Sequence, residues 1–205
     1  MATRSTPVLP GAFLVPLDAR TGSVVWETKM AGESARYQGI APLVAKGNVI
    51  MGVDTLTGGR VDAYNSETGQ HVWRWSVIPK PGETGSETWF GDSWKMGGRP
   101  TWLSGSYDPD LNLLYWGTGQ PAHDFVGDMR KGDNLYTDCM VALDADTGKF
   151  KWYFQFTPRD THDWDAVEMP VLVDLSLKAK SASCWFKLIA MDTIMCLTAR
   201  TESFC

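Results

Sequence analysis

The sequence has little of what several classes of protein need. It contains 19 Lys and Arg against 24 Asp and Glu, so it has no basic excess with which to bind nucleic acid. Its uninterrupted apolar runs are short, as in residues 139–143, and none approaches the length of a membrane span. Residues 1–10 carry one arginine and no apolar stretch of signal-peptide length. We therefore expect no nucleic-acid partner and no membrane span, and no signal peptide is visible.

The four cysteines form no CxxC pair, which removes the usual zinc and thioredoxin-type patterns. No stretch shows a strong amphipathic-helix periodicity. The chain has 205 residues, of which 43% are hydrophobic and 21% charged, so it can bury a core without disulfides. These properties predict one large folded domain or two small ones.

Tryptophan and glycine, in contrast, are abundant, with 10 and 20 copies. Both occur in a pattern, A-x-D/N-x-x-T-G-x-x-x-W, whose three copies end at Trp26, Trp73 and Trp152. The first copy has Pro16 in place of Ala. Asp or Asn followed by Gly is typical of tight turns, because glycine tolerates positive φ. Each copy therefore predicts a hairpin whose returning strand carries a tryptophan that can pack between sheets.

The spacing of the copies predicts repeated small sheets with an insertion. Thr21, Thr68 and Thr147 of the pattern lie 47 and then 79 residues apart. Residues 79–100 are rich in Gly, Pro, Ser and Thr and predict an inserted loop. Further strands are predicted at residues 42–44, 49–53, 113–116 and 169–173. The predicted fold class is all-β, with the blades of a β-propeller, and three copies are too few to close a ring.

Four further motifs occur in order along the chain: residues 97–102 (GGRPTW), 115–121 (YWGTGQP), 132–136 (GDNLY) and 157–165 (TPRDTHDWD). Together with the three turns, they resemble the pyrroloquinoline quinone (PQQ)-dependent alcohol dehydrogenases, the methanol and ethanol dehydrogenase family of quinoproteins. The resemblance covers residues 11–180. It implies an eight-bladed propeller with PQQ and a metal ion near its axis, of which this chain holds about three blades as a partial propeller domain.

The resemblance assigns a cofactor contact and a metal ligand to two of these motifs. Trp102 matches the family tryptophan beneath the PQQ ring, and indole offers the largest flat face for a tricyclic quinone. Gln120 stands where the family has a metal-binding Asn, and it keeps the amide oxygen while adding one methylene. A core tryptophan and a plain turn residue are the alternative interpretations.

A further metal ligand is expected shortly before the second repeat turn. Asp54 aligns with the family's metal-binding Glu, counted back from residues 61–64. Aspartate also binds Ca²⁺, although it reaches about one bond less far. The following residues 56–59 keep the family pattern poorly, so a solvated loop aspartate is the favoured alternative.

The carboxylates of the last motif are expected to carry the chemistry. Laid without gaps on residues 157–170, the family pattern places the catalytic aspartate on Asp163. Asp165 then falls where the lanthanide-using branch has an extra carboxylate. Anchoring instead on Trp164-Asp165 would make Asp165 catalytic, but this requires a two-residue deletion. We therefore expect Asp163 to be a general base and metal ligand and Asp165 a further ligand, with a plain hydrogen-bonded turn as the alternative.

The resemblance implies an oxidoreductase that oxidises a small alcohol with PQQ and Ca²⁺, or a lanthanide ion, in the periplasm. It also implies an electron acceptor such as a cytochrome c. The alternatives are an inactive truncated propeller fragment and a non-catalytic β-propeller interaction module. Uptake of PQQ together with a metal distinguishes these from an enzyme.

The last residues depart from the family pattern. Residues 181–205 hold three of the four cysteines, Cys184, Cys196 and Cys205, and show no turn signal. In the frame displaced by two nucleotides, permitted codons for this segment can encode a string with the family patterns N-R-N-G and L-D-R-x-x-G. We therefore expect residues 181–205 to be an aberrant tail produced by a frameshift near Ser181. Gene sequence across this point tests that expectation.

Overall fold

Four antiparallel sheets make up the part of the chain that the computed structural model describes, namely residues 8–9, 13–30, 40–55, 58–98, 101–177, 180–189 and 193–198. Two sheets have four strands each and two have three. The helical turns within these residues are three short 3-10 helices, and none is long and apolar enough to cross a membrane. The predicted all-β class with blade-like sheets is thereby confirmed.

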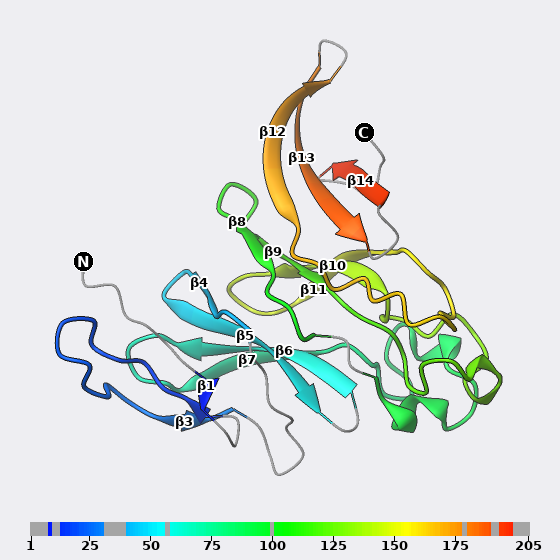
Figure 1. Cartoon of the computed structure of the whole chain (residues 1–205), viewed down its shortest axis with the longest axis horizontal. Coiled ribbons are helices and arrows are strands. Elements are labelled where there is room, and N and C mark those ends of the chain that lie inside the picture. The colour runs from blue at the N-terminus through cyan, green and yellow to red at the C-terminus, as the bar shows by residue number, and fades with distance from the viewer. Residues whose placement is uncertain are drawn as a thin grey trace.

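The two four-stranded sheets form the centre of the molecule (Figure 1). Each is an up-and-down meander in chain order, which is the arrangement of a propeller blade. The predicted strands at residues 42–44, 49–53 and 113–116 fall on β4 (Leu43–Ala45), β5 (Asn48–Thr55) and β9 (Leu113–Gly117). The first sheet contains β4 (Leu43–Ala45), β5 (Asn48–Thr55), β6 (Gly58–Asn65) and β7 (His71–Ser76), and the second contains β8 (Ser106–Asp108), β9 (Leu113–Gly117), β10 (Cys139–Asp144) and β11 (Phe150–Gln155).

A three-stranded sheet flanks this pair at each end of the chain. In Figure 1, β12 (Val171–Leu177) and β13 (Lys180–Ile189) form a long curved ribbon that extends away from the four-stranded sheets. The predicted strand at residues 169–173 falls on the start of β12. Of the segment 181–205, residues 190–192 and 199–205 lie outside the described part, and the rest belongs to β13 and to β14 (Thr193–Thr198). The strands are β1 (Val8–Leu9), β2 (Phe13–Leu14) and β3 (Thr28–Lys29) in one sheet and β12 (Val171–Leu177), β13 (Lys180–Ile189) and β14 (Thr193–Thr198) in the other.

The three repeat turns close as their residues predict. The side-chain oxygen of Asn65 accepts the backbone N–H groups of Glu67 and Thr68 at 3.0 Å each. Asp18 and Asp144 cap their own turns in the same way. The glycines that close the three turns have φ values between 67° and 73°, in the left-handed region that favours glycine.

The tryptophan of each of the first two repeats contacts the turn of the next repeat. The Trp26 indole N–H donates to the Ser66 carbonyl at 3.1 Å, and the Trp73 N–H donates to the Ala145 carbonyl at 3.1 Å. A Cβ added at Gly148 would lie 2.4 Å from the Trp73 ring, so only glycine leaves room for this approach. The repeat therefore encodes the contact between adjacent sheets as well as each turn.

Two long connections interrupt the regular blades. The β7–β8 connection contains η1 (Ser86–Thr88) and η2 (Ser93–Met96), which confirms the inserted loop predicted at residues 79–100, except that residues 99–100 lie outside the described part. A second connection, residues 118–138 between β9 and β10, contains η3 (Gly127–Met129). The motifs at residues 115–121 and 132–136 overlap this second connection, and their residue pattern does not predict it as a separate insertion.

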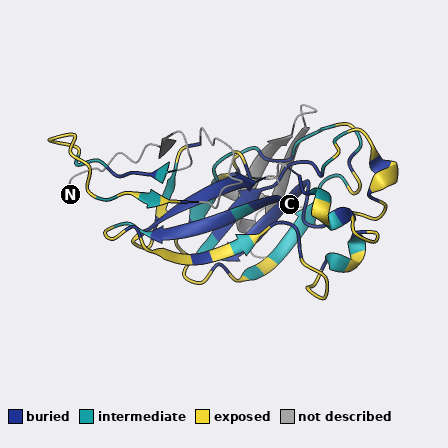
Figure 2. Cartoon of the chain, turned by 90° about the horizontal axis from the view of Figure 1, so that it is seen from below, coloured by how far each residue is buried: buried dark blue, intermediate teal, exposed yellow. Residues whose placement is uncertain are grey.

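The core follows the two central sheets, where the buried residues concentrate (Figure 2). Every residue of β5 is buried. Trp116 of β9 is fully buried, and a Cβ added at Gly52 of β5 would lie 3.1 Å from its ring. The absence of a side chain at Gly52 therefore lets the two sheets approach closely.

Candidate functional site

Trp102 is held beside the ends of two central strands. The buried Thr101 hydroxyl lies 3.2 Å from the carbonyl oxygens of both Val53 in β5 and Arg60 in β6. A Cβ at Gly52 would lie 2.1 Å from the Thr101 carbonyl oxygen, so glycine is required here as well. Trp102 itself is 38% exposed, which sets it apart from the buried core tryptophans.

Gln120 is brought to the same place by backbone pairing. Gly98 and Pro121 form an isolated antiparallel bridge between the segment before Trp102 and the segment that contains Gln120. Gln120 is 4% exposed, and its Oε1 atom is buried without a hydrogen-bond partner. Buried polar atoms are almost always partnered, so this amide oxygen has the capacity to accept a further ligand.

Asp165 connects these two segments to a third. The Gln120 backbone and the Trp102 side chain lie close enough to its carboxylate to favour the charged form, and both lower the pKa of Asp165. Its Oδ1 atom is buried without a hydrogen-bond partner. Burial, followed by the negative charge of Asp163 and then that of Glu168, raises the pKa of Asp165 to about 6. A cation at this point would relieve the repulsion among these carboxylates.

The loop at residues 160–165 presents the candidate carboxylates from a constrained backbone. Asp163 and Asp165 have φ values of 63° and 45°, in a region that few residues other than glycine, asparagine and aspartate adopt. The His162 ring stacks on Trp164 with 4.8 Å between ring centroids. The backbone N–H groups of His162 and Trp164 both donate to the carboxylate of Asp160, at 2.8 Å each. A hydrogen-bonded turn is therefore present, and its acceptor is Asp160.

Asp54 lies in β5, where it pairs with Gly59 of β6 and is only 5% exposed. The favoured alternative of a solvated loop aspartate is therefore wrong, because β5 continues past the predicted end at residue 53. The contact between Thr101 and Val53 places this strand end beside the Trp102 segment. Participation of Asp54 in a metal site stays a prediction.

The converging donors suit a hard cation. Within the described ranges, no group of three or more Asp, Glu, His or Cys side chains could hold a metal ion. Two of the buried atoms without a hydrogen-bond partner belong to this site, the amide oxygen of Gln120 and one carboxylate oxygen of Asp165. Both are ligand types that Ca²⁺ accepts. The residues present therefore fit an oxygen-liganded ion, provided that the Gln120 amide takes part.

Glu168 was not singled out from the sequence, although its charge acts on Asp165. The available signal was a third carboxylate only three residues after Asp165, in a segment with no strand pattern. Asp160 was visible in its motif, but its contacts to the following amides depend on the loop conformation.

The raised pKa of Asp165 predicts that the stability of the metal-free chain depends on pH. The folded state binds the proton more tightly than the unfolded state, whose pKa is near 3.8, so stability falls as pH rises from about 4 to about 6. Asp165→Asn abolishes this loss, and we expect it to raise the free energy of unfolding at pH 7.5 by about 1 kcal/mol, discounted for solvent screening. Urea unfolding at pH 4.5 and 7.5, with Asp110→Asn as an exposed control, measures it. An equal effect of both substitutions would contradict the prediction.

Comparison with known proteins places this site in a family. Residues 27–189 match the family model described as PQQ, glucose/ethanol/alcohol dehydrogenase, β-propeller domain. Quinoprotein alcohol dehydrogenase PedH of Pseudomonas putida is 39% identical over 176 residues, covering 76% of this chain and 29% of the relative. The lanthanide-dependent methanol dehydrogenase of Methylacidiphilum fumariolicum is 37% identical over 197 residues, covering 83% of this chain and 32% of the relative.

Solved structures agree with the sequence relatives. A europium-containing methanol dehydrogenase superposes with a TM-score of 0.88 at 33% identity, covering 98% of this chain and 39% of that chain. The chain thus spans about a third or less of the length of the curated relatives it matches. The family model matches more than half of the residues of this chain, so the chain belongs to the PQQ-dependent alcohol dehydrogenase β-propeller family.

Proposed function

We propose that this chain contributes part of the active site of a PQQ-dependent dehydrogenase that oxidises a small alcohol. The observation that carries the proposal is the proximity of Asp165 to Trp102 and Gln120, both of which act on the pKa of its carboxyl. These three residues come from separate loops, and the family resemblance assigns each of them to the PQQ and metal site.

Each residue has a distinct part in the proposed site. Trp102, which is 38% exposed, offers an indole face against which a flat quinone can stack. Gln120, Asp163, Asp165 and Asp54 would hold the metal ion through amide and carboxylate oxygens. When bound, PQQ accepts the two electrons of alcohol oxidation while the ion acts as a Lewis acid.

Asp163 is the proposed general base. Its carboxylate would accept the proton of the alcohol hydroxyl, a role that requires it to be ionised at working pH. The backbone on both sides of Asp163 is hydrogen-bonded to Asp160, which limits the movement of the loop. Asp165 as the base is the competing assignment, and the experiment below separates the two.

The proposed ion is Ca²⁺ or a lanthanide. Asp165 adds a second carboxylate beside Asp163, and its own charge is disfavoured by burial in the metal-free chain. A trivalent ion compensates more negative charge than a divalent one. The named lanthanide dependence of one relative and the europium in a similar solved structure support the same choice.

We also propose a periplasmic location and a cytochrome c as electron acceptor, both from the family resemblance. Residues 11–180 are the proposed propeller part and residues 181–205 the proposed product of a frameshift. An inactive fragment or an interaction module is the outcome if the chain folds but takes up no cofactor.

Equilibrium dialysis of the purified chain against PQQ tests the proposal, with Ca²⁺, with Eu³⁺ or with a chelator present. We expect PQQ uptake that requires a metal and that the chelator abolishes. Asp165→Asn should weaken uptake more with Eu³⁺ than with Ca²⁺. Asp163→Asn should retain PQQ uptake but abolish reduction of the bound PQQ by alcohol. If Asp165→Asn abolishes this reduction and Asp163→Asn does not, Asp165 is the base. A folded chain that binds no PQQ under any condition would overturn the proposed function.

A further inference from the structure

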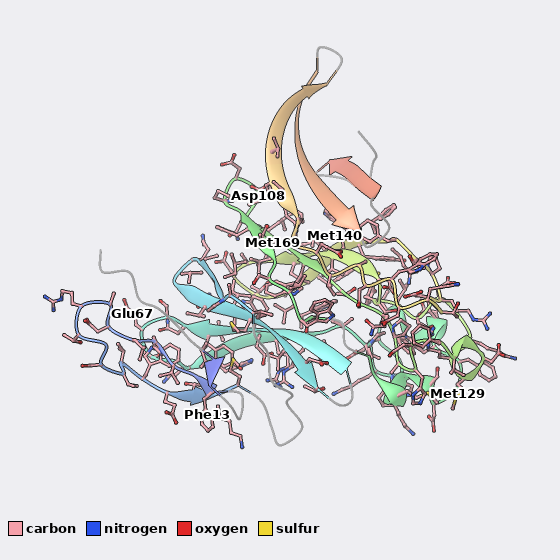
Figure 3. All side chains as sticks on the ribbon, viewed as in Figure 1. Phe13, Glu67, Asp108, Met129, Met140 and Met169 are labelled. Carbon is pink, nitrogen blue, oxygen red and sulfur yellow. The ribbon has the colours of Figure 1, made fainter. Side chains whose placement is uncertain are left out.

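One motif that the proposed site leaves unused, residues 132–136, is joined to the loop of the candidate carboxylates by one buried side chain. Arg130 is fully buried, although its neighbour Met129 is 51% exposed and lies at the outer edge of the molecule (Figure 3). The Arg130 guanidinium donates to Asn134 Oδ1 at 3.1 Å, within the motif at residues 132–136. It also donates to the backbone carbonyls of His123 and Asp124, at 3.2 and 2.9 Å. Arg130 therefore ties together the insertion between β9 and β10.

The same guanidinium reaches the loop of the candidate carboxylates. It donates a hydrogen bond to the backbone carbonyl of Asp160, thirty residues along the chain. Burial lowers the pKa of Arg130, while the negative charge of Asp160 is the largest effect that opposes this shift. A second cation from the loop, Arg159, donates to the Gly127 carbonyl at 3.3 Å and to Asp128 at 3.2 Å. The start of the loop is thus fastened to the insertion by two arginines.

The Asp160 side chain then fastens the rest of the loop. It is 1% exposed, and its two carboxylate oxygens each accept one backbone amide. Oδ1 accepts the N–H of His162 and Oδ2 accepts that of Trp164, both at 2.8 Å. These two amides flank Asp163, so the backbone on each side of that residue is held by one carboxylate.

The loop needs such restraint because of its backbone conformation. The positive φ values of Asp163 and Asp165 are sparsely populated by residues other than glycine. Conformations of this kind persist where surrounding contacts impose them. Release of the two amides would let both aspartates return to commoner conformations and redirect their carboxylates.

We propose that Asp160, held by Arg130, is a positioning residue that directs the Asp163 and Asp165 carboxylates toward the metal ion. It acts through the loop and not as a ligand, because both of its oxygens are engaged by backbone amides. The inference rests on the proposed function, since it takes these two aspartates as metal ligands.

The test uses two readouts on the 205-residue chain. Hydrogen–deuterium exchange of the metal-free chain should show the amides of His162 and Trp164 exchanging about tenfold faster in Asp160→Ala. Terbium luminescence should show the Kd for Tb³⁺ rising about 10- to 100-fold, with more water bound to the ion. Asp160→Asn keeps one acceptor oxygen of the same shape, so its effect on both readouts should be intermediate.

The control is Asp110→Asn, which removes an exposed carboxylate outside the loop and the insertion and should change neither readout. Unchanged exchange at both amides in Asp160→Ala, or unchanged terbium affinity and hydration despite faster exchange, would overturn the inference. If Asp160→Ala does not fold, Asp160→Asn replaces it, and unchanged amide exchange or unchanged terbium affinity in that variant would overturn the inference. A wild-type chain that binds no Tb³⁺ would instead count against the proposed function, and the exchange arm would still test the restraint.

Discussion

Replacing Trp73 with alanine should destabilise the chain by about 3–5 kcal/mol, the range typical of a buried tryptophan lost from a core. Trp73 is 7% exposed and is held in the contact between the two four-stranded sheets. Its indole N–H donates to the Ala145 carbonyl at 3.1 Å, and its ring lies against Gly148. The substitution removes both contacts and leaves a cavity where adjacent blades meet. Urea unfolding followed by far-UV circular dichroism measures the loss.

Two further variants identify the source of this effect. Trp73→Phe retains an aromatic ring but no N–H donor, so it should cost less than the alanine variant. Trp94→Ala is the control, because Trp94 is only half-buried and lies in the inserted loop outside the blades. A Trp73→Ala chain no less stable than Trp94→Ala would show that the repeat tryptophan does not hold the sheets together.

The second large effect is expected at Trp102. Trp102→Ala should weaken metal-dependent PQQ binding about 10- to 100-fold, because loss of the stacking face forfeits about 1.5–3 kcal/mol of apolar burial. The free energy of unfolding should change much less than in Trp73→Ala, since Trp102 is 38% exposed. Equilibrium dialysis against PQQ with Ca²⁺ or Eu³⁺ measures the affinity.

Trp102→Phe offers a smaller aromatic face and should fall between wild type and the alanine variant. Trp94→Ala again serves as control and should bind PQQ as wild type does. Equal PQQ affinity of wild-type and Trp102→Ala chains would remove Trp102 from the cofactor site. The interpretation of the family motif at residues 97–102 would then fail for this chain.

Local residue patterns were sufficient to predict the blades. In each repeat turn, Asp or Asn accepts backbone amides only two or three residues away, and a glycine takes the positive φ. Such contacts depend on short sequence spacing, so they can be predicted without knowing the fold. The alternation of strands and turns, the all-β class and the first inserted loop follow from the same local chemistry.

The site is different because its contacts join distant segments. Trp102, Gln120 and Asp165 were predicted through a family resemblance, and no spacing rule required them to meet. Their proximity depends on the bridge between Gly98 and Pro121 and on the course of the loop at residues 160–165.

The residue pattern did not predict the burial of Asp54, the influence of Glu168 on Asp165 or the contacts of Asp160. Burial of Asp54 reflects the length of β5 and the sheets around it, and the influence of Glu168 on Asp165 depends on how the loop returns. The role of Asp160 depends on left-handed residues that bring two amides onto one carboxylate. Sequence alone determined the repeat, its turns and the kinds of donor available. Tertiary structure decided which of these donors share a site, because burial and charge proximity arise only when separate loops are packed together.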